Sequence, residues 1–374
     1  MTYGEIMRYR YTEENTLRKN KSPFSDNPFM MGYESNIFEA DEKLGFRFPD
    51  GKIISKMGFI SLSEKIKELK QNQKILLNMG DSSTSGWNSE KITKKNKNVF
   101  APFFTYKTYS DLIEEQSNLF VINAGVPGYS SLQGKIYLQR LLSFFEQKKI
   151  RIDYITAYFG NNDGTYNKLG DSTRLVSKKI RSKSSVRVSI QEFKKNISDM
   201  IDLSKNHGAM FIFFMPLVRY SWLPGMRSQK RKEEFKISFT KLQNSFVKTK
   251  LLRAMSLFKR GMYEKAVEED MVLPRLKKRY GDVLKKIADE ENLLLINVQN
   301  ELMVDQTEQY FADYCHLLEK ANQLLVDRFF SLLHIQKKNK KIIPFRFRLF
   351  KAISHIRFPK KEDEEISENN YTLY

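Results

Sequence analysis

The feature that most constrains the fold is an alternation of short apolar runs with longer stretches of helical period. Each apolar run is almost continuous, and the runs cover residues 74–79, 119–124, 154–159, 210–215 and 293–298. A strand of this kind must be buried on both faces, which is typical of a parallel sheet between two layers of helices. The sequence therefore predicts an α/β fold with a five-stranded parallel sheet and helices near 61–71, 131–148, 189–206, 279–291 and 317–333.

Four stretches depart from this alternation and suggest the domain organisation. Residues 1–72 are predicted to form an N-terminal extension packed on the main domain, with two short strands around a turn within 45–54. Residues 73–334 form the main domain, interrupted at about 218–275 by a basic helical insertion that turns at Gly261. A basic stretch also covers 178–187. Residues 335–374 combine a basic amphipathic segment with an acidic tail.

Composition limits the class of protein. With 374 residues, 41% of them hydrophobic, the chain can bury a sizeable core. The net charge of +20 predicts affinity for an anionic partner such as nucleic acid, a membrane face or a charged substrate. The single cysteine, Cys315, excludes an intramolecular disulfide and a cysteine-based zinc site. The start of the chain lacks the apolar core of a signal peptide, so we expect a cytoplasmic protein and leave peripheral membrane attachment open.

The first apolar run ends abruptly in Gly80-Asp81-Ser82. This places the Ser82 hydroxyl at the carboxyl edge of the sheet, where open α/β folds put their chemistry. A serine nucleophile needs a base, and imidazole has a suitable pKa near neutrality. Of the four histidines, only His316 follows the last strand and returns to this edge. Asp313, three residues earlier, can reach the other ring nitrogen and fix its tautomer.

Three groups at strand ends are candidate donors to an oxyanion. They are the backbone N–H groups of Ser82 and Gly128 and the side-chain amide of Asn162. Each motif taken alone has a simple structural explanation, since Asp-x-x-His often begins a helix and the glycine-rich segments are ordinary turns. Their joint occurrence at successive strand ends favours a catalytic site.

These four blocks resemble those of the SGNH hydrolases, also called the GDSL esterase/lipase family. The first block matches Gly80 to Ser82, the second Asn123 to Ser131, the third Gly160 to Asp163 and the last Asp313 to His316. The resemblance covers roughly residues 70–217 and 280–333. The chain departs from the family in having Ser83-Thr84 where the lipase form of the first block has Leu-Ser, and in its long insertion.

The resemblance implies a three-layer α/β/α fold of SGNH/flavodoxin-like type. It also implies a Ser-His-Asp mechanism in which Ser82, His316 and Asp313 are catalytic, without a metal or another cofactor. The oxyanion hole would consist of Ser82, Gly128 and Asn162.

The leading functional hypothesis is a serine esterase that hydrolyses an acyl ester, most simply an O-acetyl ester on a carbohydrate. The form of the first block and the extended N-terminal segment favour a carbohydrate over a lipid. One alternative is an O-acyltransferase that uses the same triad in surface-polysaccharide modification. Another is a non-catalytic basic protein with a relict triad that binds a membrane or nucleic acid, although no nucleic-acid-binding motif is present.

Some features allow a structural and a functional explanation. The basic insertion is either an amphipathic hairpin with a solvated basic face or a lid that recruits an anionic glycan or a lipid-linked substrate. Residues 337–361 suit either an interfacial helix on an anionic membrane or a helix docked on the domain. Trp87 lines a pocket or belongs to the core. Cys315 is expected to be a packed residue, and Asp81 and Asp163 are expected to stabilise their own turns.

Overall fold

A computed structural model gives the structure of the chain. It describes residues 38–48, 51–55, 58–87, 106–167, 170–172, 175, 186–225, 245–302 and 304–335. The predictions for residues 1–37, for much of the basic stretch 178–187 and for the C-terminal segment from 336 onward therefore lie outside the described residues.

The centre of the fold is a seven-stranded sheet with strand order β4-β3-β6-β5-β7-β8-β9. The five predicted strands are all present and pair in parallel: β5 (Ile75–Gly80), β6 (Phe120–Gly125), β7 (Tyr154–Tyr158), β8 (Met210–Phe214) and β9 (Leu294–Ile296). The order of these five is that of a flavodoxin-like sheet, in which the first strand lies between the second and the third. The carboxyl ends of β5, β6 and β7 therefore lie side by side.

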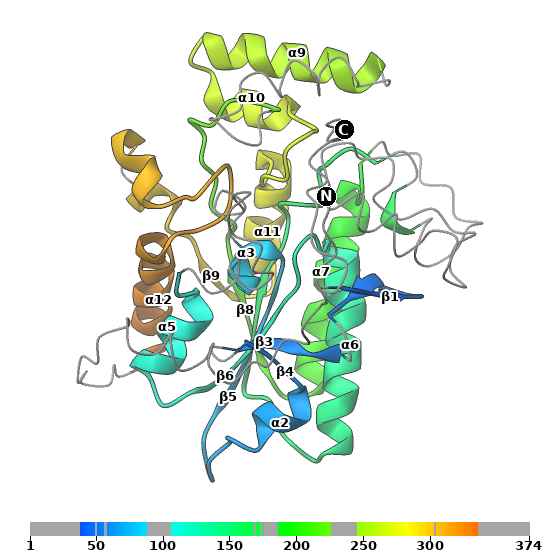
Figure 1. The fold of residues 1–374 in the computed structure, drawn as a ribbon, viewed down its shortest axis with the longest axis vertical. Coiled ribbons are helices and arrows are strands. Elements are labelled where there is room, and N and C mark those ends of the chain that lie inside the picture. The colour runs from blue at the N-terminus through cyan, green and yellow to red at the C-terminus, as the bar shows by residue number, and fades with distance from the viewer. Residues whose placement is uncertain are drawn as a thin grey trace, which may run out of the picture. The chain divides into compact units, whose positions relative to one another are not determined.

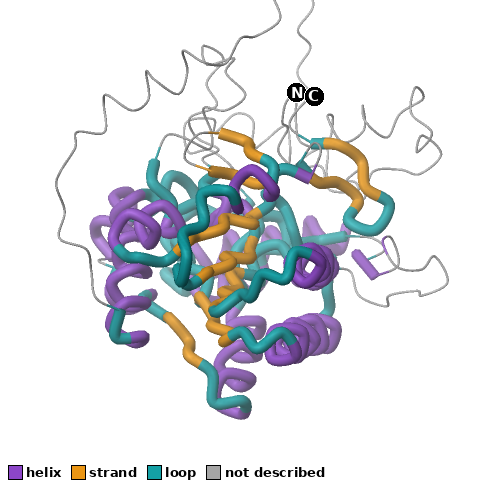
Figure 2. Tube along the Cα trace, turned by 90° about the horizontal axis from the view of Figure 1, so that it is seen from below, coloured by secondary structure: helices purple, strands orange, loops and turns teal. Residues whose placement is uncertain are grey.

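Helices cover both faces of this sheet, as Figures 1 and 2 show. Successive side chains of a strand point to opposite faces, so Leu77 and Phe213 join one apolar cluster while Leu76 and Ile212 join the other. On the first face pack α6 (Ser131–Gln147), α7 (Ile190–Asn206) and α11 (Lys278–Glu290). On the second face pack α5 (Tyr109–Gln116) and α12 (Glu319–Leu333). The predicted α/β/α layering is confirmed.

The N-terminal part enlarges the sheet in a way that the sequence did not indicate. The short strands β1 (Glu39–Asp41) and β2 (Gly45–Arg47) pair with each other, and β3 (Ile53–Ser55) pairs with β4 (Gly58–Ile60). The two strands expected around the turn in 45–54 therefore exist but are not partners. β3 also pairs antiparallel with β6 and covers that edge of the parallel sheet. The following helix, α2 (Leu62–Ile66), is shorter than predicted.

The insertion contains the expected helical hairpin. Helix α9 (Ser245–Lys259) and helix α10 (Tyr263–Glu269) are joined at Gly261, whose φ of +74° is readily adopted by glycine. A fully buried ion pair closes the insertion, with Arg275 Nη2 2.8 Å from Asp270 Oδ2. Short 3-10 turns at Gln299–Glu301 and Val304–Gln309 lead from β9 towards α12. Over the residues that the structure describes, no helix is both long and apolar enough to cross a bilayer.

Candidate active site

The turn that presents Ser82 is set by tight packing at the end of β5. Asp81 caps the short helix α3 (Ser82–Ser85) by accepting a hydrogen bond from the Ser83 N–H at 2.9 Å. A Cβ on Gly80 would lie 1.8 Å from Thr84 Oγ1, and one on Gly125 would lie 2.4 Å from the Ser85 nitrogen. The two glycines at the ends of β5 and β6 are thus required for the turn to sit this close to the sheet.

His316 and Asp313 lie in one short loop. Phe311 bridges to Leu317, and the Ala312 N–H donates to the His316 carbonyl at 2.9 Å, which closes the loop. Asp313 Oδ1 accepts the backbone N–H groups of Cys315 and His316 at 3.0 and 2.9 Å. Its other oxygen, Oδ2, lies 2.6 Å from His316 Nδ1. This local network fixes both the carboxylate and the imidazole that it orients.

The loop meets the Ser82 turn directly. His316 Nε2 lies 2.8 Å from Ser82 Oγ. With a proton on Nδ1, which faces the carboxylate, Nε2 accepts the Ser82 hydroxyl hydrogen. The Ser83 hydroxyl also donates to the Cys315 carbonyl at 3.3 Å and ties the two segments together. Ser82 and His316 are 8% and 4% exposed, so the pair is almost shielded from water but reachable at its edge.

Gly128 lies in a turn that follows β6. The Tyr129 N–H donates to the Val126 carbonyl at 3.2 Å, and Gly128 has a φ of +81°. A proline in second place and a glycine of positive φ in third place are typical of a type II turn. This turn directs the strand end into α6.

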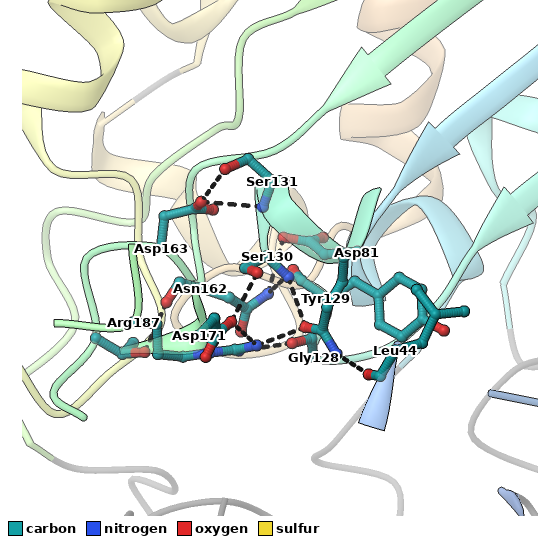
Figure 3. A network of polar contacts seen from close by, with 12 residues as sticks. Leu44, Asp81, Gly128, Tyr129, Ser130, Ser131, Asn162, Asp163, Asp171 and Arg187 are labelled. Atoms are coloured by element: carbon teal, nitrogen blue, oxygen red, sulfur yellow. Dashed lines mark hydrogen bonds and ion pairs between the residues drawn. The ribbon is translucent and has the colours of Figure 1, made fainter. Parts of the chain in front are cut away.

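Asn162 joins the three strand ends. Its amide nitrogen donates to the Tyr129 carbonyl at 3.0 Å and to Asp81 Oδ2 at 3.3 Å. Figure 3 shows Asp81, Tyr129 and Asn162 meeting at one point. Both hydrogens of the amide are thus directed at protein acceptors.

Burial alters two carboxyl groups next to these turns. Asp81 is inaccessible, and desolvation raises its pKa to about 6. Desolvation likewise raises the pKa of Asp163 to about 6. Asp81 stabilises its own turn as expected. Asp163 does not: its Oδ1 accepts from the N–H and hydroxyl of Ser131 at 2.9 and 2.5 Å, and so joins the loop after β7 to the start of α6.

Asp313, Cys315 and His316 are the group of possible metal ligands found in the described part of the chain. Their chemistry suits a hydrogen-bonded loop better than a metal site. His316 Nδ1 is engaged by Asp313, and burial raises the pKa of the Cys315 thiol well above its usual value, whereas a metal-binding thiol must be ionised. Cys315 is a packed residue, as expected.

The structure brings together most of the predicted site. Ser82, His316 and Asp313 form one hydrogen-bonded chain, and Asn162 lies against the Ser82 turn and the Gly128 turn. Trp87 is 3% exposed and belongs to the apolar core, so of its two predicted roles the core role is the one found. Sequence reasoning missed Arg187 and Asp171, a buried ion pair behind the Gly128 turn. Arg187 is the last residue of the basic stretch 178–187, and no pattern in the neighbouring sequence distinguishes it as a buried residue.

Comparisons with known proteins identify one family. A model of the GDSL-like Lipase/Acylhydrolase family matches residues 79–324. No curated protein sequence matches the chain. Among solved structures, a lipase/acylhydrolase from Enterococcus faecalis is similar at 17% identity and a TM-score of 0.38, covering 72% of this chain and 100% of that one. An acetyl xylan esterase from Geobacillus stearothermophilus is similar at 14% identity and a TM-score of 0.35, covering 73% and 100%.

Proposed function

This chain belongs to the GDSL-like lipase/acylhydrolase family and is an ester-hydrolysing enzyme, and we propose that it removes a short acyl group, most simply acetyl, from a carbohydrate through an acyl-serine at Ser82. The observation that supports the mechanism is the chain of hydrogen bonds from Asp313 through His316 to Ser82, at 2.6 and 2.8 Å. Those distances are the ones at which a base can take a proton from a nucleophile.

In this mechanism Ser82 Oγ forms a bond to the ester carbonyl carbon while His316 Nε2 takes the hydroxyl proton. The Asp313 carboxylate stabilises the imidazolium that results. The carbonyl oxygen becomes an oxyanion, which the Ser82 and Gly128 N–H groups and the Asn162 amide would bind. The bond from carbon to the alcohol oxygen then breaks, and His316 returns the proton to that oxygen. Water, activated by His316 in the same way, releases the acid from Ser82.

The proposal of a carbohydrate ester rests on the residues after the nucleophile. In place of the leucine of the lipase form, the Ser83 side chain donates to a backbone carbonyl of the His316 loop. The next residue, Thr84, has its hydroxyl 2.8 Å from Tyr109 Oη and its carbonyl bound by Asn123. This part of the nucleophile turn is thus polar and engaged with the protein, which supports a small acyl group rather than a long apolar chain.

The test is hydrolysis of two kinds of ester by the full chain and by its Ser82→Ala variant. We expect the full chain to release acetate from chemically O-acetylated oligosaccharides and to act poorly on 4-nitrophenyl palmitate. The Ser82→Ala variant should release neither product. A clear preference for the palmitate would overturn the proposed substrate, and unchanged hydrolysis by Ser82→Ala would overturn the proposed nucleophile.

Contact of the basic C-terminal segment with an anionic membrane also stays a proposal, since residues 336–374 lie outside the described residues. Co-sedimentation of the chain with anionic liposomes, with and without these residues, tests it. Equal binding by both forms would contradict membrane attachment through this segment.

A further inference from the structure

A buried ion pair lies next to the Gly128 turn (Figure 3). Arg187 and Asp171 are each 1% exposed, and Arg187 Nη2 lies 2.8 Å from Asp171 Oδ2. Arg187 Nε lies 3.2 Å from the other carboxylate oxygen. Both residues follow the loop that carries Asn162, and neither has a role in the chemistry described above.

The side chains of this pair bind the Gly128 turn and the start of α6. Arg187 Nη1 donates to the Gly128 carbonyl at 2.6 Å, and Nη2 donates to Gln133 Oε1 at 2.6 Å. Asp171 Oδ2 accepts the Ser130 hydroxyl hydrogen at 2.7 Å. The Gln133 amide nitrogen in turn donates to the Leu44 carbonyl at 2.6 Å, which brings the loop between β1 and β2 into the same network.

The backbone of Arg187 is attached to the other oxyanion segment. Its N–H donates to the Thr165 carbonyl at 2.9 Å, and the Thr165 hydroxyl donates to the Asn162 carbonyl at 2.6 Å. The next N–H, of Val188, donates to the Asp163 carbonyl at 3.1 Å. Arg187 therefore connects the loop of Asn162, through its main chain, to the turn of Gly128, through its side chain.

We propose that Arg187, held in place by Asp171, is a positioning residue that sets the spacing between the Gly128 N–H and the Asn162 amide. The inference rests on the proposed function, because it assumes that these two groups bind an oxyanion. Arginine suits the role because its planar guanidinium directs several N–H donors at fixed angles, whereas a lysine ammonium is a single flexible point charge. A buried ion pair is by itself weak evidence for a role in stability.

The chain offers a matched control in the buried pair Arg275–Asp270. Arg275 and Asp270 are 1% and 0% exposed and lie 2.8 Å apart, like the first pair. Arg275 Nη1 also donates to backbone carbonyls, those of Arg219 and Trp222. This pair belongs to the insertion, and among the described residues its side chains form their hydrogen bonds with the insertion rather than with Gly128 or Asn162.

The experiment compares the full-length variants Arg187→Met and Arg275→Met, with 4-nitrophenyl acetate as the probe substrate. We expect Arg187→Met to lower kcat about 10–100-fold with little change in KM, because a misplaced donor loses transition-state binding. The rate of Ser82 labelling by a fluorophosphonate should fall by a similar factor, because the phosphoryl oxygen uses the same donors. Arg275→Met should keep kcat within about threefold of wild type, and Arg187→Lys should recover part of the loss.

Several outcomes would overturn the inference alone while wild type stays active. The first is a folded Arg187→Met variant with wild-type kcat and a lowered thermal midpoint, which would show a purely structural role. The second is an equal loss of kcat in Arg187→Met and Arg275→Met, which would show that the loss does not depend on contact with the oxyanion turns. If Arg187→Met does not fold, Asp171→Asn decides in its place: a loss of kcat at constant KM supports the inference, and wild-type kcat overturns it. A wild-type chain without Ser82-dependent hydrolysis would overturn the proposed function itself.

Discussion

The acid–base half of the proposed site lies within one short loop, whereas the oxyanion half is assembled from segments far apart in the sequence. Asp313 and His316 are three residues apart and are fixed by bonds within the loop. Gly128 and Asn162 are connected through Tyr129, Asp163 and the Arg187–Asp171 pair. Local geometry is set by spacing in the chain, but long-range geometry must be stabilised by buried contacts. We therefore expect the two halves to fail differently when mutated.

The largest effect is expected in the acid–base half. In Asp313→Asn the remaining oxygen can still accept the N–H groups of Cys315 and His316, so the loop keeps its shape. The new amide would donate to His316 Nδ1 and leave the wrong tautomer to face Ser82. We expect kcat to fall about 10⁴-fold with an unchanged thermal midpoint, measured by 4-nitrophenyl acetate hydrolysis and thermal unfolding. A loss of less than tenfold would contradict the role given to Asp313.

A smaller effect is expected for a donor in the oxyanion half. Asn162→Ala removes the amide, and kcat should fall roughly 10²–10³-fold with KM little changed. Asn322→Ala is the control, because Asn322 is also a buried asparagine but lies on α12, away from the proposed oxyanion hole. Its amide donates to the Lys107 carbonyl at 3.0 Å. Equal activity of Asn162→Ala and Asn322→Ala would remove Asn162 from the oxyanion hole.

The smallest expected effect is a pH-dependent change in the free energy of unfolding, caused by the buried carboxyl of Asp163 in the oxyanion half. Burial raises the pKa of Asp163 from 3.8 to about 6, so the folded state binds this proton more tightly than the unfolded state. The stability due to this carboxyl is fully present below pH 3.8 and is lost as the pH rises through about 6. The asparagine of the Asp163→Asn variant does not titrate, so the variant does not lose this stability as the pH rises. Its amide oxygen can still accept hydrogen bonds from Ser131.

We therefore expect the free energy of unfolding of Asp163→Asn, minus that of wild type, to increase by about 1–3 kcal/mol from pH 4 to pH 7. Urea unfolding at several pH values measures the difference. A difference that stays constant or decreases over this range would contradict the proton linkage assigned to Asp163.

The same contrast explains what could be predicted from the sequence. The five parallel strands follow from continuous apolar runs, and Asp313 and His316 from a spacing that one turn satisfies. The antiparallel strand β3 was not expected as a partner of β6, because a strand of three residues has no pattern that specifies its partner. Arg187 and Asp171, 16 residues apart, were missed because only tertiary packing distinguishes a buried arginine from an exposed one.

The measurement that tests the central claim most directly is fluorophosphonate labelling of the folded chain, with the labelled residue identified by peptide mass spectrometry. The account predicts one label, on Ser82, which is absent in Ser82→Ala and forms much more slowly in Asp313→Asn and Asn162→Ala. Labelling at another residue, or no labelling of folded wild-type protein, would contradict the claim that the two halves of the site converge on Ser82.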